Sequence, residues 1–261
     1  MNDSNSSTLK LLSWNIDGLD AEDLEERTEA VLATILSRQP DVVLLQEVVE
    51  YSLNFFQTRC VGYNVLAGQH TFRYFNAMLI KSSAAVDPQN SAPETLSFEN
   101  SQQGRHFLTY PIRFADADII LMTSHLESCG SSSRERKNQL REILLYMRRR
   151  VNSVNVIFGG DTNLRDKEVN AVGGLPNEVL DVWTSCGSPK DAEFTWDISE
   201  NDNKDMNGAQ PKLRFDRIFL RKAQSGKVVK PSTFTLIGKE RLSCGRFASD
   251  HWGVLLEFSI E

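Results

Sequence analysis

Runs of apolar residues divide the chain into segments of strand and helix length. Residues 9–16 (LKLLSWNI) and 41–48 (DVVLLQEV) have strand length, and the second run is continuously apolar, which is typical of a strand buried on both faces. Between them, residues 21–38 carry apolar side chains at helical spacing, acidic residues in the first turns and a proline beyond the end. We therefore expect a helix that is capped by Asp20 and has Leu36 on its buried face.

The same patterns continue through the rest of the chain. Further strands are predicted at 63–66, 74–81, 105–114, 117–124, 154–159, 213–220 and 251–258. A second helix is expected at about 133–150, with Leu140, Ile143, Leu144 and Met147 toward the core. Its three final arginines complement the negative end of the helix dipole, or alternatively contact nucleic acid. Strands and helices that alternate in this way predict an α/β fold.

Length and composition favour one globular unit. The chain has 261 residues, of which 40% are hydrophobic and 25% charged, and no polar stretch separates two self-contained apolar patterns. We expect a flexible tail at 1–8 and a single catalytic domain at 9–261. No run of 18 apolar residues and no basic leader is present, so no contact with a membrane is expected.

Charge and cysteine usage limit the mode of nucleic-acid binding and the cellular compartment. A formal net charge of −6 argues against a protein that coats nucleic acid through a broad cationic surface. The four cysteines are dispersed without CxxC pairs, which indicates free thiols in a reducing compartment rather than disulfides or a zinc site. We expect the nucleus and the cytoplasm.

Four short polar motifs follow or interrupt the β-rich runs: SWN at 13–15, LQE at 45–47, GDTN at 160–163 and SDH at 249–251. Each motif alone is consistent with an ordinary turn or helix cap. Together they offer carboxylates for a hard cation, a base for a water molecule, and amide and imidazole donors for phosphate oxygens. The set predicts a metal-assisted phosphoesterase.

These motifs, in this order, resemble the endonuclease/exonuclease/phosphatase superfamily over about residues 9–259. The resemblance implies a four-layer sandwich of two packed mixed β-sheets flanked by helices. Longer strings resemble one branch of that superfamily: WNIDGLD at 14–20, TSHLES at 123–128, GDTNLRD at 160–166, GGLP at 173–176, FTWD at 194–197, RFDRIF at 214–219 and SDHWG at 249–253. That branch hydrolyses the bond between a tyrosine of trapped topoisomerase 2 and a 5′ DNA phosphate, and it leaves a 5′-phosphate end for repair.

The resemblance implies roles for the residues in the motifs. Glu47 matches the ligand of Mg²⁺, with Mn²⁺ as an alternative ion, and Asp161 matches the group that orients and deprotonates the attacking water. His251 matches a phosphate-binding histidine that Asp216 orients. Further catalytic contacts are expected from Asn15, Asn163, Asp250 and His125. The other two histidines, His70 and His106, are expected to be structural.

Substrate recognition is expected from Tyr74, Ser128, Arg165, Trp196 and Phe215. The three aromatic residues match positions near the bound DNA end in the branch, Arg165 follows the GDTN loop where a guanidinium can meet phosphate, and Ser128 is expected to add a hydroxyl contact. The implied partners are a single-stranded or overhanging 5′ DNA end with a tyrosyl adduct, the topoisomerase 2 remnant peptide, and tyrosyl-linked RNA. Two segments depart from the branch. The loop at 199–208 (SENDNKDMNG) has Met206 as its one apolar residue where relatives have an apolar cap, and 129–133 (CGSSS) lacks an arginine that relatives carry.

Other activities remain open at this point. The same catalytic set serves an abasic-site endonuclease, an inositol-phosphate or sphingomyelin phosphodiesterase, and a deadenylase. A non-catalytic scaffold with this fold is a further alternative. Retention of Glu47, Asp161 and His251 together argues against it.

Overall fold

The computed structural model describes residues 7–68, 73–82, 86–88 and 92–261. Most of the predicted tail (1–6) and His70 lie outside the described residues. Thr8, the last residue assigned to that tail, already pairs with Ser259 in a β-sheet.

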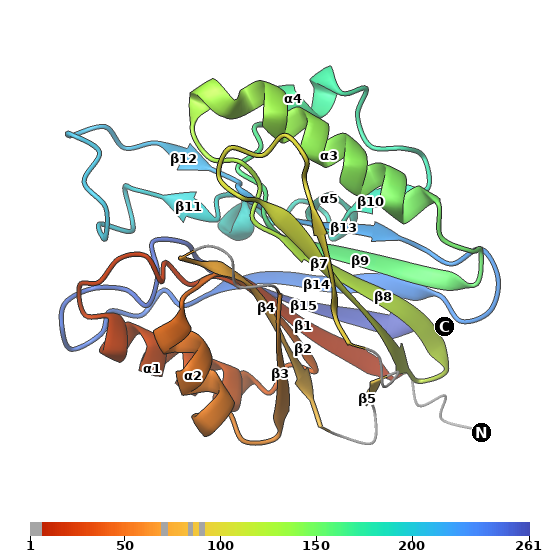
Figure 1. The fold of residues 1–261 in the computed structure, drawn as a ribbon, viewed down its shortest axis with the longest axis horizontal. Coiled ribbons are helices and arrows are strands. Elements are labelled where there is room, and N and C mark those ends of the chain that lie inside the picture. The colour runs from red at the N-terminus through yellow and green to blue at the C-terminus, as the bar shows by residue number, and fades with distance from the viewer. Residues whose placement is uncertain (1–6, 69–72, 83–85, 89–91) are drawn as a thin grey trace.

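Two β-sheets lie face to face in the centre of the molecule (Figure 1). The first has six strands in the order β14 (Val229–Ile237), β15 (Gly253–Ile260), β1 (Thr8–Asn15), β2 (Val42–Val48), β4 (Phe75–Lys81) and β3 (Tyr63–Ala67). The second has seven, in the order β10 (Val179–Asp181), β13 (Asp216–Arg221), β9 (Val154–Asp161), β8 (Ala117–Ser124), β7 (His106–Phe114) and β5 (Val86–Pro88), with β6 (Glu94–Ser97) also paired to β7. A separate hairpin joins β11 (Trp196–Asp197) to β12 (Lys212–Leu213).

Each sheet is mixed, because it contains one parallel pair among antiparallel ones. β1 runs parallel to β2, and β8 runs parallel to β9. The carboxyl ends of both parallel pairs therefore lie at the same end of the sandwich, which is where α/β proteins gather functional side chains.

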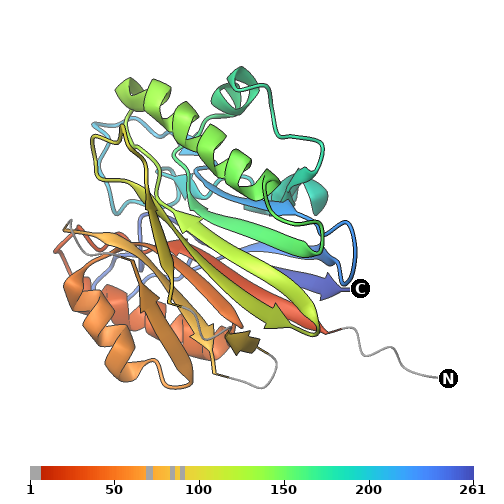
Figure 2. The same ribbon diagram turned by 45° about the vertical axis from the view of Figure 1, so that its right-hand side comes forward.

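Helices cover the outer faces of both sheets, as the turned view in Figure 2 also shows. The first sheet is covered by α1 (Leu24–Arg38) and α2 (Glu50–Arg59), and the second by α3 (Ser133–Arg148) and α4 (Asp166–Ala171). The short helix α5 (Val182–Ser185) follows β10, and 3₁₀ turns occur at Gly130–Ser132 and Lys190–Ala192. The predicted four-layer sandwich is confirmed. No described helix is long and apolar enough to cross a bilayer.

Alternating side chains separate the core into layers. In β1, Leu9 and Leu11 face the other sheet, whereas Leu12 and Trp14 face α1 and α2. β2 alternates in the same way, so both of its faces are apolar and both are buried. This burial explains the continuous apolar run that predicted the strand.

Two details of the first predicted helix were wrong. The helix begins at Leu24, not near residue 21, and its N-cap position is Asp23 with a left-handed φ of 50°. Asp20 does not cap it, because its carboxylate accepts a hydrogen bond from the Glu22 N–H and pairs with cations from distant loops. Leu36 is 37% exposed and does not belong to the buried face.

Several elements had no clear signal in the sequence pattern. α2 and β14 were not predicted, and the run at 213–220 divides between β12 and β13. α2 lacks a clean apolar stripe, although Leu53, Phe55 and Phe56 pack against the first sheet. β14 is an edge strand with many exposed side chains, so its hydrophobic alternation is weak.

Candidate active site

The predicted catalytic residues converge at the carboxyl ends of the central strands. Asn15 ends β1, Glu47 is the next-to-last residue of β2, and Asp161 ends β9. His125 follows β8 directly. Asp216 opens β13 opposite Asp161, and His251 precedes β15 by two residues. Both sheets therefore contribute side chains to one site.

Three short turns of the same kind aim the motif residues. The side chain of Asn15 accepts a hydrogen bond from the N–H of Asp17 at 3.0 Å, and that of Asp161 accepts one from the N–H of Asn163 at 3.0 Å. Ser249 accepts one from the N–H of His251 at 3.1 Å. Such i to i+2 contacts are the turn chemistry of Asx and Ser/Thr residues, and they let each chain leave its strand sharply.

Glu47 is displaced out of the regular strand. The register between β2 and β4 shifts between Leu45 and Val48, and Glu47 has a left-handed φ of 54°. Bulges and positive φ in non-glycine residues cluster at functional sites, because the surrounding structure must hold them there. Gly18 supports this position, since a Cβ on it would lie 2.2 Å from the Glu47 carbonyl oxygen.

Asp161 is the centre of the hydrogen-bond network. Its Oδ2 accepts from the Asn15 side-chain amide at 3.0 Å and lies 3.2 Å from Nε2 of His125 and 3.7 Å from Nε2 of His251. The same Asn15 amide also donates to Oε1 of Glu47 at 3.2 Å. The Asn15 amide thus bridges the carboxylates of Glu47 and Asp161.

His251 is held by a carboxylate on its far side. Its Nδ1 lies 2.8 Å from Oδ2 of Asp216, as expected for an oriented and charged imidazole. Thr195 fixes Asp216, because its hydroxyl accepts hydrogen bonds from the N–H groups of Phe215 and Asp216. Burial opposes protonation, but the carboxylates of Asp216, Asp161 and Asp250 outweigh it and raise the pKa of His251 well above its usual range.

His125 has the opposite charge state. Burial, followed by the cations Arg105 and His251, lowers its pKa well below the usual range, so the ring is neutral. Its Nε2 lies 3.2 Å from Oδ2 of Asp161. Its Nδ1 is buried without a hydrogen-bond partner among the described residues and lies 3.6 Å from Oε1 of Glu47.

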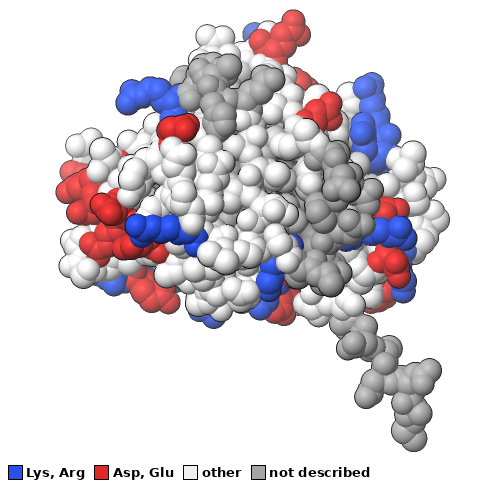
Figure 3. Space-filling model, turned by 60° about the horizontal axis from the view of Figure 1, so that its bottom comes forward, with Lys and Arg blue, Asp and Glu red and all other residues white. Residues whose placement is uncertain are grey.

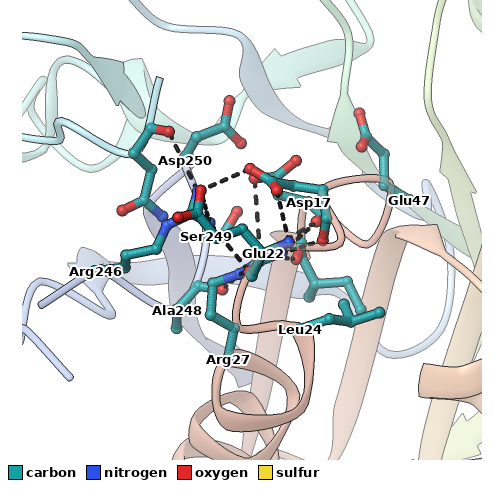
Figure 4. Close-up of polar contacts among 12 residues, drawn as sticks. Asp17, Glu22, Leu24, Arg27, Glu47, Arg246, Ala248, Ser249 and Asp250 are labelled. Carbon is teal, nitrogen blue, oxygen red and sulfur yellow. Dashed lines mark hydrogen bonds and ion pairs between the residues drawn. The ribbon is translucent and has the colours of Figure 1, made fainter. Parts of the chain in front are cut away.

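Carboxylates crowd this end of the sandwich. Burial and then the charges of Asp250 and Asp17 raise the pKa of Glu47 to about 7, and burial raises that of Asp161 to about 6. Figure 4 shows three of these carboxylate residues, Asp250, Asp17 and Glu47, in one close-up; we call this group the acidic edge of the site. Ligand atoms of Glu47, His125 and Asp161 lie within 4.8 Å of one another. The unpartnered nitrogen and the uncompensated carboxylates fit a divalent cation, with Glu47 as the most accessible donor of the three.

Aromatic side chains form two walls beside the catalytic cluster. On one side, Trp196 and Phe215 have ring centroids 5.5 Å apart, and the Arg165 guanidinium lies 5.1 Å from the Phe215 ring. The indole N–H of Trp196 donates to Asp250 at 3.1 Å. On the other side, the Tyr74 and His125 rings lie 6.1 Å apart. A nucleobase is the kind of ligand that stacks between such surfaces.

Two predicted residues make other contacts. The hydroxyl of Ser128 donates to Gln103 at 2.9 Å, and the side-chain amide of Asn163 donates to the Leu126 carbonyl at 3.4 Å. Both lie beside the cluster, and neither side chain hydrogen-bonds to a carboxylate or imidazole of it; Asn163 contacts Asp161 through its backbone N–H alone. Asn163 also has a left-handed φ of 51°, which indicates that its backbone conformation forms the turn.

Several residues of the site were not predicted. Arg105 is buried, lies 5.0 Å from the Tyr74 ring and donates to Ser128 at 3.4 Å. It places a guanidinium beside the segment that lacks the expected arginine. Asp17 and Thr195 were also missed, although both lie within motif strings. Arg105 directly precedes an apolar strand, and nothing in the sequence distinguishes it from an arginine that is exposed to solvent.

Surface charge agrees with local rather than broad recognition of an anion. On the face in Figure 3, blue cationic side chains are scattered and acidic ones gather at the left edge. Four acidic residues crowd the start of α1: Glu22, Asp23, Glu25 and Glu26. Among the described residues of this face, no continuous cationic surface is present. A phosphate ester would have to be neutralised in the site itself.

Comparisons with known proteins agree with this geometry. The sequence profile of the Endonuclease/Exonuclease/phosphatase family matches residues 12–251. Tyrosyl-DNA phosphodiesterase 2 of Homo sapiens is 41% identical over 256 residues, which cover 98% of this chain and 69% of that protein. The protein of the same name from Gallus gallus is 42% identical over 97% of this chain and 68% of its own length.

Solved structures lead to the same relatives. The crystal structure of D. rerio TDP2 complexed with single strand DNA product superimposes with a TM-score of 0.92 at 40% identity, and it covers 97% of this chain and 99% of that one. C. elegans TDP2 gives 0.85 at 31% identity over 97% and 75% of the two chains. A mannosyl-6-phosphatase of Bacteroides thetaiotaomicron gives 0.70 at 14% identity, which shows a shared fold alone.

Proposed function

Because the chain belongs to the Endonuclease/Exonuclease/phosphatase family, and within it to the tyrosyl-DNA phosphodiesterase 2 relatives, we propose that it hydrolyses the bond between a tyrosine side chain and a 5′ DNA phosphate. The natural substrate in this proposal is a single-stranded or overhanging 5′ end that carries the remnant of trapped topoisomerase 2. A 5′ phosphate remains for repair. Tyrosyl-linked RNA is included as a further substrate.

One observation carries the proposal. The carboxylate of Asp161 lies within 3.7 Å of Asn15, His125 and His251, and the Asn15 amide extends the network to Glu47. These residues come from strand ends of two different sheets. A phosphodiesterase needs this combination of a base, an anchored cation and donors for phosphate oxygens, whereas a scaffold does not need to retain it.

Mg²⁺ is the ion we propose, with Mn²⁺ as an alternative. Glu47 would hold it, with Asp17 and Asp250 close enough to contribute to its affinity. When bound, the ion supplies positive charge to the phosphate oxygens. Carboxylate donors and the absence of thiolates from the cluster suit a hard cation of this kind.

The protein groups have separate tasks in the proposed reaction. Asp161, with a pKa near 6, is ionised at neutral pH and accepts the proton of the attacking water. Protonated His251 donates to a phosphate oxygen and stabilises the charge that develops there. Asp216 keeps that imidazole charged and oriented. Arg165, Trp196 and Phe215 bind and orient the DNA end.

The leaving group makes this set of residues sufficient. A tyrosine phenol has a pKa of about 10, so its phenolate departs far more readily than the alkoxide of a sugar. No strong general acid is needed on the leaving oxygen. Cleavage within intact DNA would require one, so the site is better suited to the tyrosyl ester.

A substrate panel tests the proposal. The protein is incubated with Mg²⁺ and either a 5′-phosphotyrosyl oligonucleotide, an abasic duplex, or a sphingomyelin or inositol-phosphate substrate. We expect rapid release of tyrosine from the first and little turnover of the others. Glu47→Ala, Asp161→Asn and His251→Ala, each tested alone, should lower kcat by at least about 100-fold. Turnover of the abasic or lipid substrate with the tyrosyl adduct untouched contradicts the assignment.

The same proposal places the protein in the nucleus and the cytoplasm. Cys60, Cys129, Cys186 and Cys244 are all free thiols, which suits a reducing compartment. Fluorescence microscopy of the tagged protein tests this part independently of the chemistry.

A further inference from the structure

The loop between β11 and β12 is fixed by polar contacts, in keeping with the polar composition of residues 199–208. The side chain of Asn203 donates to the Phe247 carbonyl and accepts from its N–H, both at 2.9 Å. Asn201 is fully buried and donates to the Ser249 carbonyl at 2.9 Å. Met206 is 42% exposed and forms no apolar lid. The loop is therefore attached to the segment 246–249 that leads into the SDH motif.

Lys204 gives this loop an ionic attachment at the acidic edge. Its Nζ lies 2.9 Å from Oδ2 of Asp17 and 2.7 Å from Oδ2 of Asp20. Arg246 reaches the same oxygen of Asp20 at 2.8 Å and also donates to the Asn203 carbonyl at 3.2 Å. Figure 4 shows the neighbouring part of this network, with Arg246 and Asp17 on the same side as Asp250.

Two observations separate this contact from an ordinary surface ion pair. Asp17 is only 4% exposed, and its remaining cation, Arg27, is farther away at 3.7 Å. Removal of Lys204 would leave the buried Asp17 carboxylate beside those of Asp250 and Glu47, with Arg27 as its compensating cation. The Lys204 side chain is 32% exposed, but the carboxylate that it leaves behind is buried, so the loss costs more than that of a fully exposed pair.

The hairpin that carries Lys204 also carries the stacking tryptophan. Trp196 lies at the start of the hairpin, in β11, and its indole donates to Asp250. The hairpin is thus attached to the acidic edge at two points, one in β11 and one in the middle of the loop that leads to β12. The position of the aromatic wall depends on both attachments.

From these contacts we propose that Lys204 is a positioning residue for the DNA substrate. Its ammonium group fastens the 198–209 loop to Asp17 and Asp20, and it thereby keeps the Trp196 wall in place before the DNA end arrives. The inference rests on the proposed function for the nature of the ligand.

Replacement of Lys204 tests the proposal with readouts that do not depend on turnover. In Lys204→Met, amide hydrogen exchange in residues 198–209 should become at least tenfold faster. The affinity for a 5′-phosphorylated single-stranded oligonucleotide, measured by fluorescence anisotropy, should fall about tenfold, which corresponds to about 1.4 kcal/mol. With the tyrosyl substrate, KM should rise by a similar factor while kcat changes less than about twofold.

Three further variants make the result decisive. Lys204→Arg keeps the charge and should restore both exchange and affinity to within about threefold of the wild type. Asp20→Asn removes one of the two carboxylates that Lys204 contacts and leaves Asp17, so it should change both readouts in the same direction as Lys204→Met, and the loss in the double variant should be less than the sum of the two single losses. Lys239→Met is the matched control, since it removes an exposed pair to Glu200 in the same loop at 3.5 Å and should change neither readout.

Some outcomes would overturn the proposal. Unchanged exchange and affinity in Lys204→Met would refute it, as would an equal loss in Lys239→Met. A drop in the melting temperature of Lys204→Met that is large enough to account for its loss of affinity would assign Lys204 a general structural role instead. Failure of the wild type to release tyrosine would refute the proposed function alone, because hydrogen exchange still decides whether the loop is tethered.

Discussion

His125 and His251 lie on either side of the Asp161 carboxylate, but their surroundings give them different charges. His251 has a buried carboxylate, Asp216, on its outer nitrogen, whereas His125 has the cation Arg105 nearby. A neutral imidazole and an imidazolium therefore lie within 4 Å of the same carboxylate oxygen. The difference comes from the second neighbour of each ring, which no short motif encodes.

The charge states lead to a pH prediction. Asp161 acts as a base only when ionised, so kcat/KM should fall as the pH drops through about 6. His251 acts only when protonated, and its raised pKa keeps it so through neutral pH. Asp216→Asn removes the largest source of that raised pKa. We expect the alkaline limb of the kcat/KM profile to move to lower pH in this variant, and the acidic limb to move to lower pH by a smaller amount, because the charge of Asp216 also raises the pKa of Asp161. A profile that merely scales down would contradict the assigned role.

Gly18 gives a second prediction for a single residue. In Gly18→Ala the new Cβ would lie 2.2 Å from the Glu47 carbonyl, so the bulge that aims Glu47 must shift. A displacement of about 1 Å in a catalytic group costs on the order of 100-fold, and we expect such a loss in kcat/KM with weaker binding of Mn²⁺ by calorimetry. Gly130→Ala, with no atom within 4 Å of its Cβ position, is the control and should remain active.

At the scale of elements, strand ends were easier to predict than the loops between them. The continuous apolar run of β2 and the apolar run at 119–123 in β8 identified these strands, because buried strands carry runs of apolar side chains. The start of α1 was missed because the Asp20 carboxylate binds Lys204 and Arg246, which are remote in sequence. Such tertiary competition overrides local capping preferences.

The residues of the site divide in the same way, into those at strand ends, which were predicted, and those in loops, which were not. Glu47, Asp161 and His251 were predicted because they lie directly at strand ends inside recognisable strings. The contributions of Arg105 and Lys204 could not be predicted, since each acts through a contact with a residue far along the chain. Contacts between residues that are far apart in the chain leave no pattern in the local sequence.

One helix supports the site through a buried ion pair. Arg136 of α3 binds Glu168 of α4 at 2.6 Å, and both side chains are almost completely buried. Glu168 also accepts a hydrogen bond from the N–H of Arg165 at 2.9 Å, so the pair fixes the turn that carries Arg165. α3 thereby positions a substrate contact from the outer layer of the sandwich.

Removal of this pair should be costly. In Arg136→Ala, Glu168 is left buried without its partner, and we expect a loss of about 3–5 kcal/mol in the free energy of unfolding by urea denaturation. Arg148→Ala on the same helix breaks the half-exposed pair with Glu178 and should cost at most about 1 kcal/mol. Equal losses in the two variants would show that burial does not determine the contribution of these pairs.

For the whole molecule, the layer between the sheets determines how the two halves of the site meet. Asn15 and Glu47 belong to the first sheet, whereas Asp161 and Asp216 belong to the second. Gly159 lies in this layer, where a Cβ would approach Ile218 to 2.8 Å and Leu44 to 2.9 Å. The close contact of the sheets allows side chains from both to reach hydrogen-bonding distance.

A cavity in that layer should destabilise the whole fold. Ile157 is fully buried between the sheets, and Ile157→Ala should lower the free energy of unfolding by about 2–5 kcal/mol. Val61→Ala, at a position 82% exposed, should change it by less than about 0.5 kcal/mol. Urea denaturation of both variants, followed by fluorescence, gives the comparison.

The position of β15 beside β1 has a consequence for synthesis on the ribosome. A nascent chain that has not yet emerged beyond residue 250 already contains Asn15, Glu47, His125 and Asp161, but it lacks His251 and leaves one edge of β1 without its neighbour. Catalytic competence therefore arises only after translation has passed β15. A half-made molecule would have the carboxylates of the site without its imidazolium, so truncated products of interrupted translation would be inert toward DNA.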